Sequence, residues 1–268
     1  MISYDIHVHT HFSDCAARDA HIDDYVPEAH RLGIELIGFA DHAWDSSVKG
    51  ASPWYGKQDF DRLTARKKEY TSMLPVRVLF GAESEYAGGV LALTERGRAL
   101  TDYVIVPHSH THMRGLVIPE GDAADPKRHA EYLANSFVSL CGHRDRGLFF
   151  GIAHPMYPVG KSYEQIEEIF SYITDDMLAE CAKAAKSSDV LLEFNLSCCA
   201  SARGKNGTSC YKRFFDISRE AGNSFFMGSD AHSPREFIAL HAQRDGLVKE
   251  YGLSETDFTA AKLRIQSE

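Results

Sequence analysis

The stretch Asp5-Ile6-His7-Val8-His9 decides the fold class, because it sets two histidines at alternate positions in an otherwise apolar run. In a β-strand, residues two apart project to the same side, so both imidazoles can face one point in space. Neutral imidazole is the commonest metal ligand in proteins. The stretch therefore predicts a strand that presents two metal ligands near its end.

The same design recurs along the chain as short apolar runs that end in a histidine or a carboxylate. Near-continuous apolar runs are typical of parallel strands buried on both faces. Amphipathic stretches lie between them, and this alternation favours parallel strands joined by helical crossovers. The expected strands are 3–9, 36–40, 76–81, 103–106, 148–152, 190–194 and 224–228, and the expected helices are 23–32, 57–73, 126–140, 163–186, 211–221 and 234–251.

Length and composition bound the class of protein. Closed α/β barrels commonly reach 268 residues as one unit, and no linker or repeat interrupts the chain, so residues 1–268 are expected to form a single domain. A hydrophobic fraction of 44% without a membrane-length apolar stretch indicates no membrane span. A net charge of −9 argues against a nucleic-acid partner. The oligomeric state is left open.

The N-terminal residues and the cysteines bear on the compartment. No export signal is visible at the start of the chain, which favours a cytoplasmic location. Six cysteines without CxxC spacing are a poor disulfide framework, so we interpret them as reduced thiols.

The strand ends carry an unusual number of ionisable side chains. A parallel barrel gathers the C-terminal ends of its strands around one opening, so these residues become neighbours. Burying so many such groups without partners would cost several kcal/mol each, and bound metal ions resolve that cost. The ring consists of His7, His9, Asp41, His42, Glu83, Glu85, His108, His110, His154, Glu193, Asn195, Asp230 and His232.

The chemistry of this ring predicts two or three divalent metal ions. Imidazole together with carboxylate suits zinc, manganese or iron, and a carboxylate can bridge two ions. The candidate ligands exceed what one ion can use, and neighbouring ions can clamp a substrate oxygen together with a hydroxide. The long segments 43–56, 111–125 and 196–210 follow strands and are expected to wall the substrate site.

With these motifs in place, the sequence resembles the PHP (polymerase and histidinol phosphatase) family. The resemblance spans most of the chain and implies a distorted (β/α)7 TIM-like barrel with a trinuclear metal centre at the C-terminal ends of the strands. It rests on Asp5-x-His7-x-His9-Thr10-x-x-Ser13-Asp14, Ala40-Asp41-His42, Gly81-x-Glu83, His154-Pro155 and Gly228-Ser229-Asp230-Ala231-His232.

The resemblance also implies a set of ligands for each metal. The first metal would be held by His7, His9, Glu83 and Asp230; the second by Glu83, His154 and a fourth-strand histidine; the third by Asp14, His42 and His232. On the fourth strand we favour His110, because Pro107 gives room for a kink, and His108 is the alternative. We interpret Cys15 as a small buried thiol rather than a ligand.

The expected activity is hydrolysis of a small-molecule phosphate ester by a metal-activated hydroxide, with the histidinol-phosphatase branch the nearest resemblance. His232 or His112 would protonate the leaving group, and Arg203 and Arg114 would grip the phosphate. Lys49, Lys205 and Arg235 are weaker candidate cations.

Two alternatives remain open. One is an amidohydrolase-like C–N hydrolase or deaminase, although the metal-bridging lysine usual there is missing from 103–112. The other is a non-catalytic module that metal ions stabilise.

Overall fold

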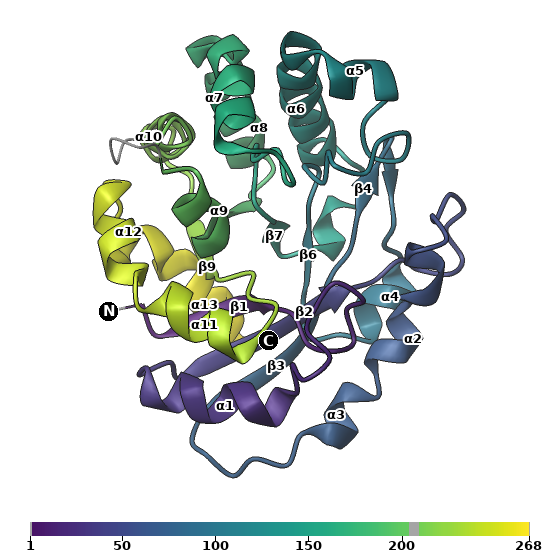
Figure 1. The fold of residues 1–268 in the computed structure, drawn as a ribbon, viewed down its shortest axis with the longest axis vertical. Coiled ribbons are helices and arrows are strands. Elements are labelled where there is room, and N and C mark those ends of the chain that lie inside the picture. Colours follow the sequence, from purple (N-terminus) through teal and green to yellow (C-terminus); the bar gives the residue numbers. More distant parts are fainter. Residues whose placement is uncertain (1, 204–208, 268) are drawn as a thin grey trace.

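A nearly closed parallel barrel forms the centre of the computed structural model, which describes residues 2–203 and 209–267 (Figure 1). Neighbouring strands are parallel and follow chain order, so each crossover returns the chain to the next strand. The expected (β/α)7 TIM-like barrel is confirmed. Its strands are β1 (Tyr4–Val8), β2 (Leu36–His42), β3 (Arg77–Glu83), β6 (Val104–Val106), β7 (Gly151–Ile152), β8 (Leu191–Asn195) and β9 (Phe225–Gly228).

Backbone contacts just beyond β1 and β9 close the barrel. The Asp230 amide donates to the His7 carbonyl at 2.7 Å, and the His9 amide donates to the Ala231 carbonyl at 2.9 Å. The two segments that carry most of the first metal's expected ligands are therefore held together by main-chain hydrogen bonds.

Two strands run clearly further than expected at their C-terminal ends, and β7 is markedly shorter than expected. β2 extends through His42 and β3 through Glu83, which fixes both side chains on regular backbone at the mouth of the barrel. β7 has only two residues, because the turn η2 (Arg146–Leu148) occupies the start of the stretch expected as a strand.

Helices surround the sheet on its outer face (Figure 1). Three expected long helices are divided, and caps account for breaks in two of them: Thr174 accepts from the Met177 amide to start a new helix, and Asp59 accepts from the Arg62 amide. The helices are α1 (Ile22–Arg31), η1 (Tyr55–Lys57), α2 (Phe60–Leu63), α3 (Arg66–Glu69), α6 (Pro126–Cys141), α7 (Tyr163–Tyr172), α8 (Asp175–Ser187), α10 (Lys212–Glu220), α11 (Pro234–His241) and α12 (Arg244–Glu250).

Several short elements lie outside the expected pattern. A hairpin of β4 (Tyr86–Ala87) and β5 (Val90–Leu91) turns at Gly88 and Gly89, both at positive φ, a conformation that glycine adopts without steric cost. The others are α4 (Glu95–Ala99), α5 (Glu120–Ala124) and α9 (Leu196–Ser201). The chain ends in η3 (Glu255–Phe258) and α13 (Thr259–Ser267), which follow the capping residue Ser254, as its sequence predicts.

Aromatic side chains fill the barrel interior beneath the site. The Tyr103 hydroxyl donates to the Ile6 carbonyl at 2.6 Å, and its ring occupies the space left by Gly81, where an added Cβ would lie 2.3 Å from the ring. The mouth thus rests on a tightly packed floor. Among the described residues no helix is both long and apolar enough to cross a bilayer. The single domain and the cytoplasmic location stay predictions.

Candidate metal centre

The first group of candidate ligands joins β1, β3 and the segment after β9. The His7 and His9 Nε2 atoms lie 3.1 Å apart, and the Asp230 Oδ1 atom lies 3.5 Å from the first and 3.1 Å from the second. Glu83 Oε2 lies 3.6 Å and 3.5 Å from the same two nitrogens. Ligand atoms around one zinc ion, each at about 2.0–2.2 Å, are separated by similar distances. His7, His9 and Asp230 therefore form a group that fits one cation, and Glu83 Oε2 lies beside the two imidazoles.

A second group uses the other oxygen of the same carboxylate. Glu83 Oε1 lies 2.9 Å from His154 Nε2 and 3.7 Å from His110 Nε2, and all three side chains are buried. Glu83 thus presents one oxygen to each of two ligand groups. That arrangement fits a carboxylate that bridges two ions.

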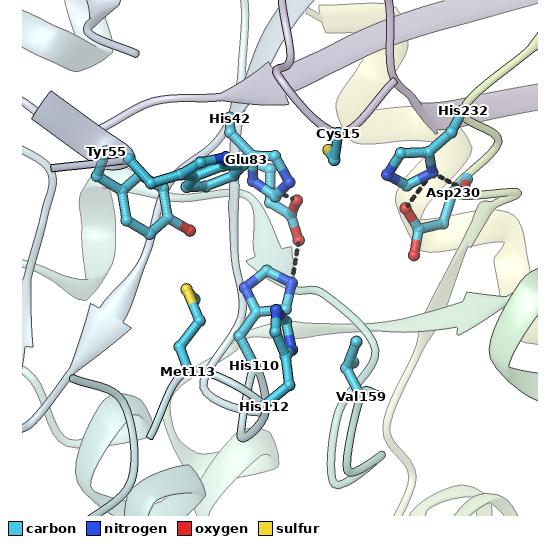
Figure 2. A pocket seen from close by; sticks show the side chains of 11 residues that line it. Cys15, His42, Tyr55, Glu83, His110, His112, Met113, Val159, Asp230 and His232 are labelled. Atoms are coloured by element: carbon cyan, nitrogen blue, oxygen red, sulfur yellow. Dashed lines mark hydrogen bonds and ion pairs between the residues drawn. The ribbon is translucent and has the colours of Figure 1, made fainter. Parts of the chain in front are cut away.

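A third group lies on the far side of His9. It places ligand atoms of His9, Cys15, His42 and His232 within 4.8 Å of one another. Figure 2 shows the Cys15 thiol between His42 and His232 at the edge of the pocket. Cys15 is exposed rather than buried as expected, because it lies at the rim of the mouth; partial desolvation, with Glu83 and Asp230 nearby, raises the pKa of its thiol. The structure thus adds Cys15, which the sequence reasoning had set aside as a ligand.

The structure does not bring Asp14 into the third group. Its exposed carboxylate points to Arg62, with Oδ1 3.2 Å from Nη1, and its amide donates to the Gln58 side chain. A turn after His9, with the Ser13 amide bonded to the Thr10 carbonyl, directs the neighbouring Cys15 towards the centre.

Four of these imidazoles share one way of being held. In each ring Nδ1 contacts an oxygen of a neighbouring side chain, which leaves Nε2 facing the centre. Metal-bound histidines characteristically have such a partner, because it fixes the ring and its tautomer. The pairs are His7–Glu193 at 2.7 Å, His9–Ser13 at 3.0 Å, His110–Glu85 at 2.7 Å and His154–Ser109 at 2.8 Å.

The fourth-strand histidine that faces the centre is His110, as the sequence reasoning favoured. His108 instead turns beneath the site, where its Nε2 accepts from the Met156 amide at 3.1 Å and its ring packs edge-on against Phe137. Burial lowers the pKa of His108 to about 3, so this imidazole is neutral.

Charges in the centre are strongly coupled. Burial would raise the pKa of Glu83, but the imidazoles of His42 and His7 outweigh it and hold that pKa well below its usual range. Burial would lower the pKa of His7, yet the surrounding carboxylates, Glu193 foremost, raise it. The metal-free site therefore favours protonated imidazole beside carboxylate, and a cation must displace that proton.

The backbone is strained at two candidate ligands. His154 has a φ of 28° and Asp230 a φ of 58°, in the left-handed region that residues other than glycine rarely adopt. Such strain persists where the surroundings enforce it, and it concentrates at functional sites. The Glu193 carboxylate accepts from the His154 amide at 2.6 Å, which holds that conformation.

Behind the ligands, buried carboxylates of Asp5 and Asp41 fix the loops. Asp5 accepts from the amides of His7 and Ser229, both at 3.0 Å, and lies 2.8 Å from His241 Nε2. Asp41 accepts from the Thr10 amide at 2.6 Å. No sequence motif around His241 indicated its contact, because it comes from a helix.

A cavity of about 220 Å³ opens onto the centre and is smaller than the usual ligand pocket of about 300–1,000 Å³, so it suits a small substrate (Figure 2). Trp54, Tyr55, Met113 and Val159 form its less polar walls. The remaining lining residues are Cys15, His42, Glu83, His110, His112, Asp230 and His232.

No arginine or lysine among the described residues lines this cavity. Arg203 instead pairs with Glu250, whose Oε2 lies 2.6 Å from Nη2. Arg114 is exposed on the loop beyond His112. Lys205 lies outside the described residues. The arrangement therefore assigns neither predicted arginine a place on the cavity wall.

Comparison with known proteins identifies the family of this chain. The family model of the PHP domain matches residues 5–197. The structure is similar to a histidinol phosphate phosphatase from Lactococcus lactis, solved with zinc, L-histidinol and phosphate, at a TM-score of 0.56 and 17% identity over 94% of each chain. No curated protein sequence matched significantly. Because the match covers most of its length, this chain belongs to the PHP domain family.

Proposed function

We propose that this protein is a metal-dependent phosphoesterase that hydrolyses a small-molecule phosphate ester. The observation that carries the proposal is the placement of Glu83, whose two oxygens face two separate groups of imidazoles at the floor of one cavity. A pair of cations bridged in this way is the usual device for phosphate-ester hydrolysis.

The donor set fits two or three divalent ions. His7, His9 and Asp230 would hold the first, with Glu83 Oε2 beside them, and Glu83, His110 and His154 would hold the second, with His42, His232 and the Cys15 sulfur for a third. Nitrogen, oxygen and one sulfur donor suit zinc best, with manganese or iron as alternatives. Once bound, such ions supply Lewis-acid chemistry at a phosphoryl oxygen and lower the pKa of water.

Protonation of the leaving group is the step that depends most on the chain's own residues. Burial and the neighbouring His110 lower the pKa of His112 to about 4, so this imidazole is neutral at neutral pH and would orient the leaving group. His232 Nδ1 lies 2.9 Å from the Asp230 carbonyl. If His232 binds a metal through Nε2, it has no spare proton, so its predicted roles as ligand and as acid exclude each other.

Histidinol phosphate is the first substrate to test, because the similar Lactococcus structure was solved with L-histidinol and phosphate. The apolar wall formed by Trp54, Met113 and Val159 would exclude water from the ester. A role in histidine biosynthesis rests on that substrate alone.

The test is phosphate release from a panel of monoesters, histidinol phosphate included, after reconstitution with zinc, manganese or iron. We expect activity that Glu83→Gln and His9→Ala abolish and that the exposed-site control His30→Asn retains. Full activity in the first two variants would refute the scheme. Metal-dependent C–N hydrolysis without phosphatase activity would favour the amidohydrolase alternative, and full metal loading without hydrolysis would favour the structural module.

A further inference from the structure

A second group of metal-type ligands lies outside the barrel mouth. The side chains of His11, His21 and Glu69 each place a ligand atom within 4.8 Å of the others, and they share no residue with the clusters of the centre. The His11 and His21 rings lie 4.5 Å apart between centroids, tilted by 53°. Two imidazoles and one carboxylate are a donor set that binds zinc with a fourth position left for water.

Backbone hydrogen bonds of the local fold bring these three side chains together. The His11 amide donates to the Ala20 carbonyl at 3.0 Å, which brings the two ends of the β1–α1 loop together and sets His11 beside His21. Glu69 ends α3, and the next segment is tied to the same place because the Thr71 amide donates to Asp23 at 3.1 Å. Three separate segments thus meet at one point on the surface.

The three side chains are not committed to other partners. His11 Nε2 lies 3.3 Å from Glu69 Oε2, longer than a charge-assisted hydrogen bond but close to the separation of two ligands on one zinc ion. His11 Nδ1 is buried without a hydrogen-bond partner among the described residues. His21 caps α1 without a side-chain hydrogen bond. Each group therefore has a ligand atom free for a cation.

The position of this cluster links it to the centre. The β1–α1 loop carries Ser13, which contacts His9, on its inner side and His11 on its outer side. α3 carries Glu69 outside and Arg66 inside, where Arg66 bonds to Asp41 at 2.9 Å. A cation on the outer side would tie the β1–α1 loop to α3, which Asp41 of β2 also links within, because Asp41 accepts from both Arg66 and the Thr10 amide.

We propose that His11, His21 and Glu69 form a peripheral binding site for a zinc-class divalent cation that braces the loop after β1 against α3. The site is partly exposed, with side-chain exposures of 24% for His11 and 42% for Glu69. It exchanges its ion with solvent more readily than the buried centre.

The test measures how many zinc ions bind to each chain. Chelator-stripped protein is reconstituted over a range of free zinc, and bound zinc per chain is measured by elemental analysis for the wild type and for His21→Asn with Glu69→Gln. Asn is a favoured helix cap, so His21→Asn preserves the start of α1. The matched control combines His30→Asn with Glu131→Gln, two exposed positions on α1 and α6.

We expect the double variant to bind one zinc fewer per chain and to lose part of the zinc-dependent rise in melting temperature, while the control matches the wild type. Equal zinc content in the wild type and the double variant would overturn the proposal and reduce the cluster to an ion pair. Because the readout is a difference of one equivalent, it does not depend on whether the centre proves catalytic.

Discussion

Glu193→Gln perturbs the metal centre while leaving every proposed ligand in place. Glu193 Oε1 lies 2.7 Å from His7 Nδ1, and Oε2 accepts from the His154 amide at 2.6 Å and from Asn195 at 3.1 Å. Glutamine keeps the shape but has one acceptor oxygen. In either orientation its NH₂ faces an N–H donor, so one of the two histidines loses its anchor.

The magnitude follows from the anchoring role. Loss of a hydrogen-bond partner behind a metal-bound histidine typically costs about 10–100-fold in metal affinity, which is about 1.4–2.8 kcal/mol. A second effect opposes the first. Glu193 is the foremost charge that raises the pKa of His7 against its burial, so the variant also weakens the proton that competes with the metal.

These two effects separate with pH. At about pH 6.5 the proton occupies His7 in the wild type, and relief from that competition offsets part of the lost anchoring. At higher pH the competition fades and the lost anchoring dominates. The affinity deficit of Glu193→Gln should therefore grow as pH rises.

The assay is a zinc titration against a chromogenic chelator at two pH values, with Glu131→Gln as a control of the same chemistry at an exposed position. An affinity unchanged at both pH values would refute the anchoring argument. So would an equal deficit in the control, because Glu131 is exposed on the outer helix α6.

Three further outcomes follow from the structure. Gly228→Ala should release metal and lower the urea midpoint, because the added Cβ would lie 1.9 Å from Glu193 Oε1; an unchanged metal content would contradict this packing. Arg66→Met should lower the free energy of unfolding in urea by about 3–5 kcal/mol, since it leaves the buried carboxylate of Asp41 without its charged partner. Arg62→Met, at a part-exposed pair, should cost under about 1 kcal/mol. Equal losses in the two variants would refute the distinction. Burial alone would lower the pKa of His110, but Glu85 and Glu83 outweigh burial and raise this pKa to about 9. The free energy of unfolding of the metal-free protein should therefore fall as pH rises from about 6.5 through 9. A flat profile would count against the pairing of His110 with these carboxylates.

The sequence predicted the barrel because each strand end carries its own evidence. Seven apolar runs terminate in polar groups, and the seven strands of the sheet lie where those runs are. The chemistry at a strand end is local: His42 and Glu83 are the last residues of β2 and β3. Helix breaks were less predictable, because a capping residue such as Thr174 competes with continuation of the helix and only packing decides the result.

The sequence could identify the residues of the site but not the hydrogen bonds that hold those residues from behind. Glu193 could be placed in the ring from its strand, yet its bond to the ring of His7 joins positions 186 residues apart. The direction of Cys15 and Asp14 depends on one turn, and neighbouring residues in a turn point apart. Sequence spacing alone cannot choose between them.

The uniform anchoring of four imidazoles distinguishes a metal centre from a buried network of ion pairs. In a plain network, Nε2 of His7 and Nε2 of His9, 3.1 Å apart, would require one ring to donate a proton to the other. A neighbouring oxygen at each Nδ1 lets both rings keep one proton on the outer side. In the metal-free protein the raised pKa of His7 favours a second proton on its Nε2, which faces His9 Nε2. A bound cation would take the place of that proton without any change in ring orientation. The partners at Nδ1 therefore hold the orientation that metal binding requires, and Glu193→Gln tests that link.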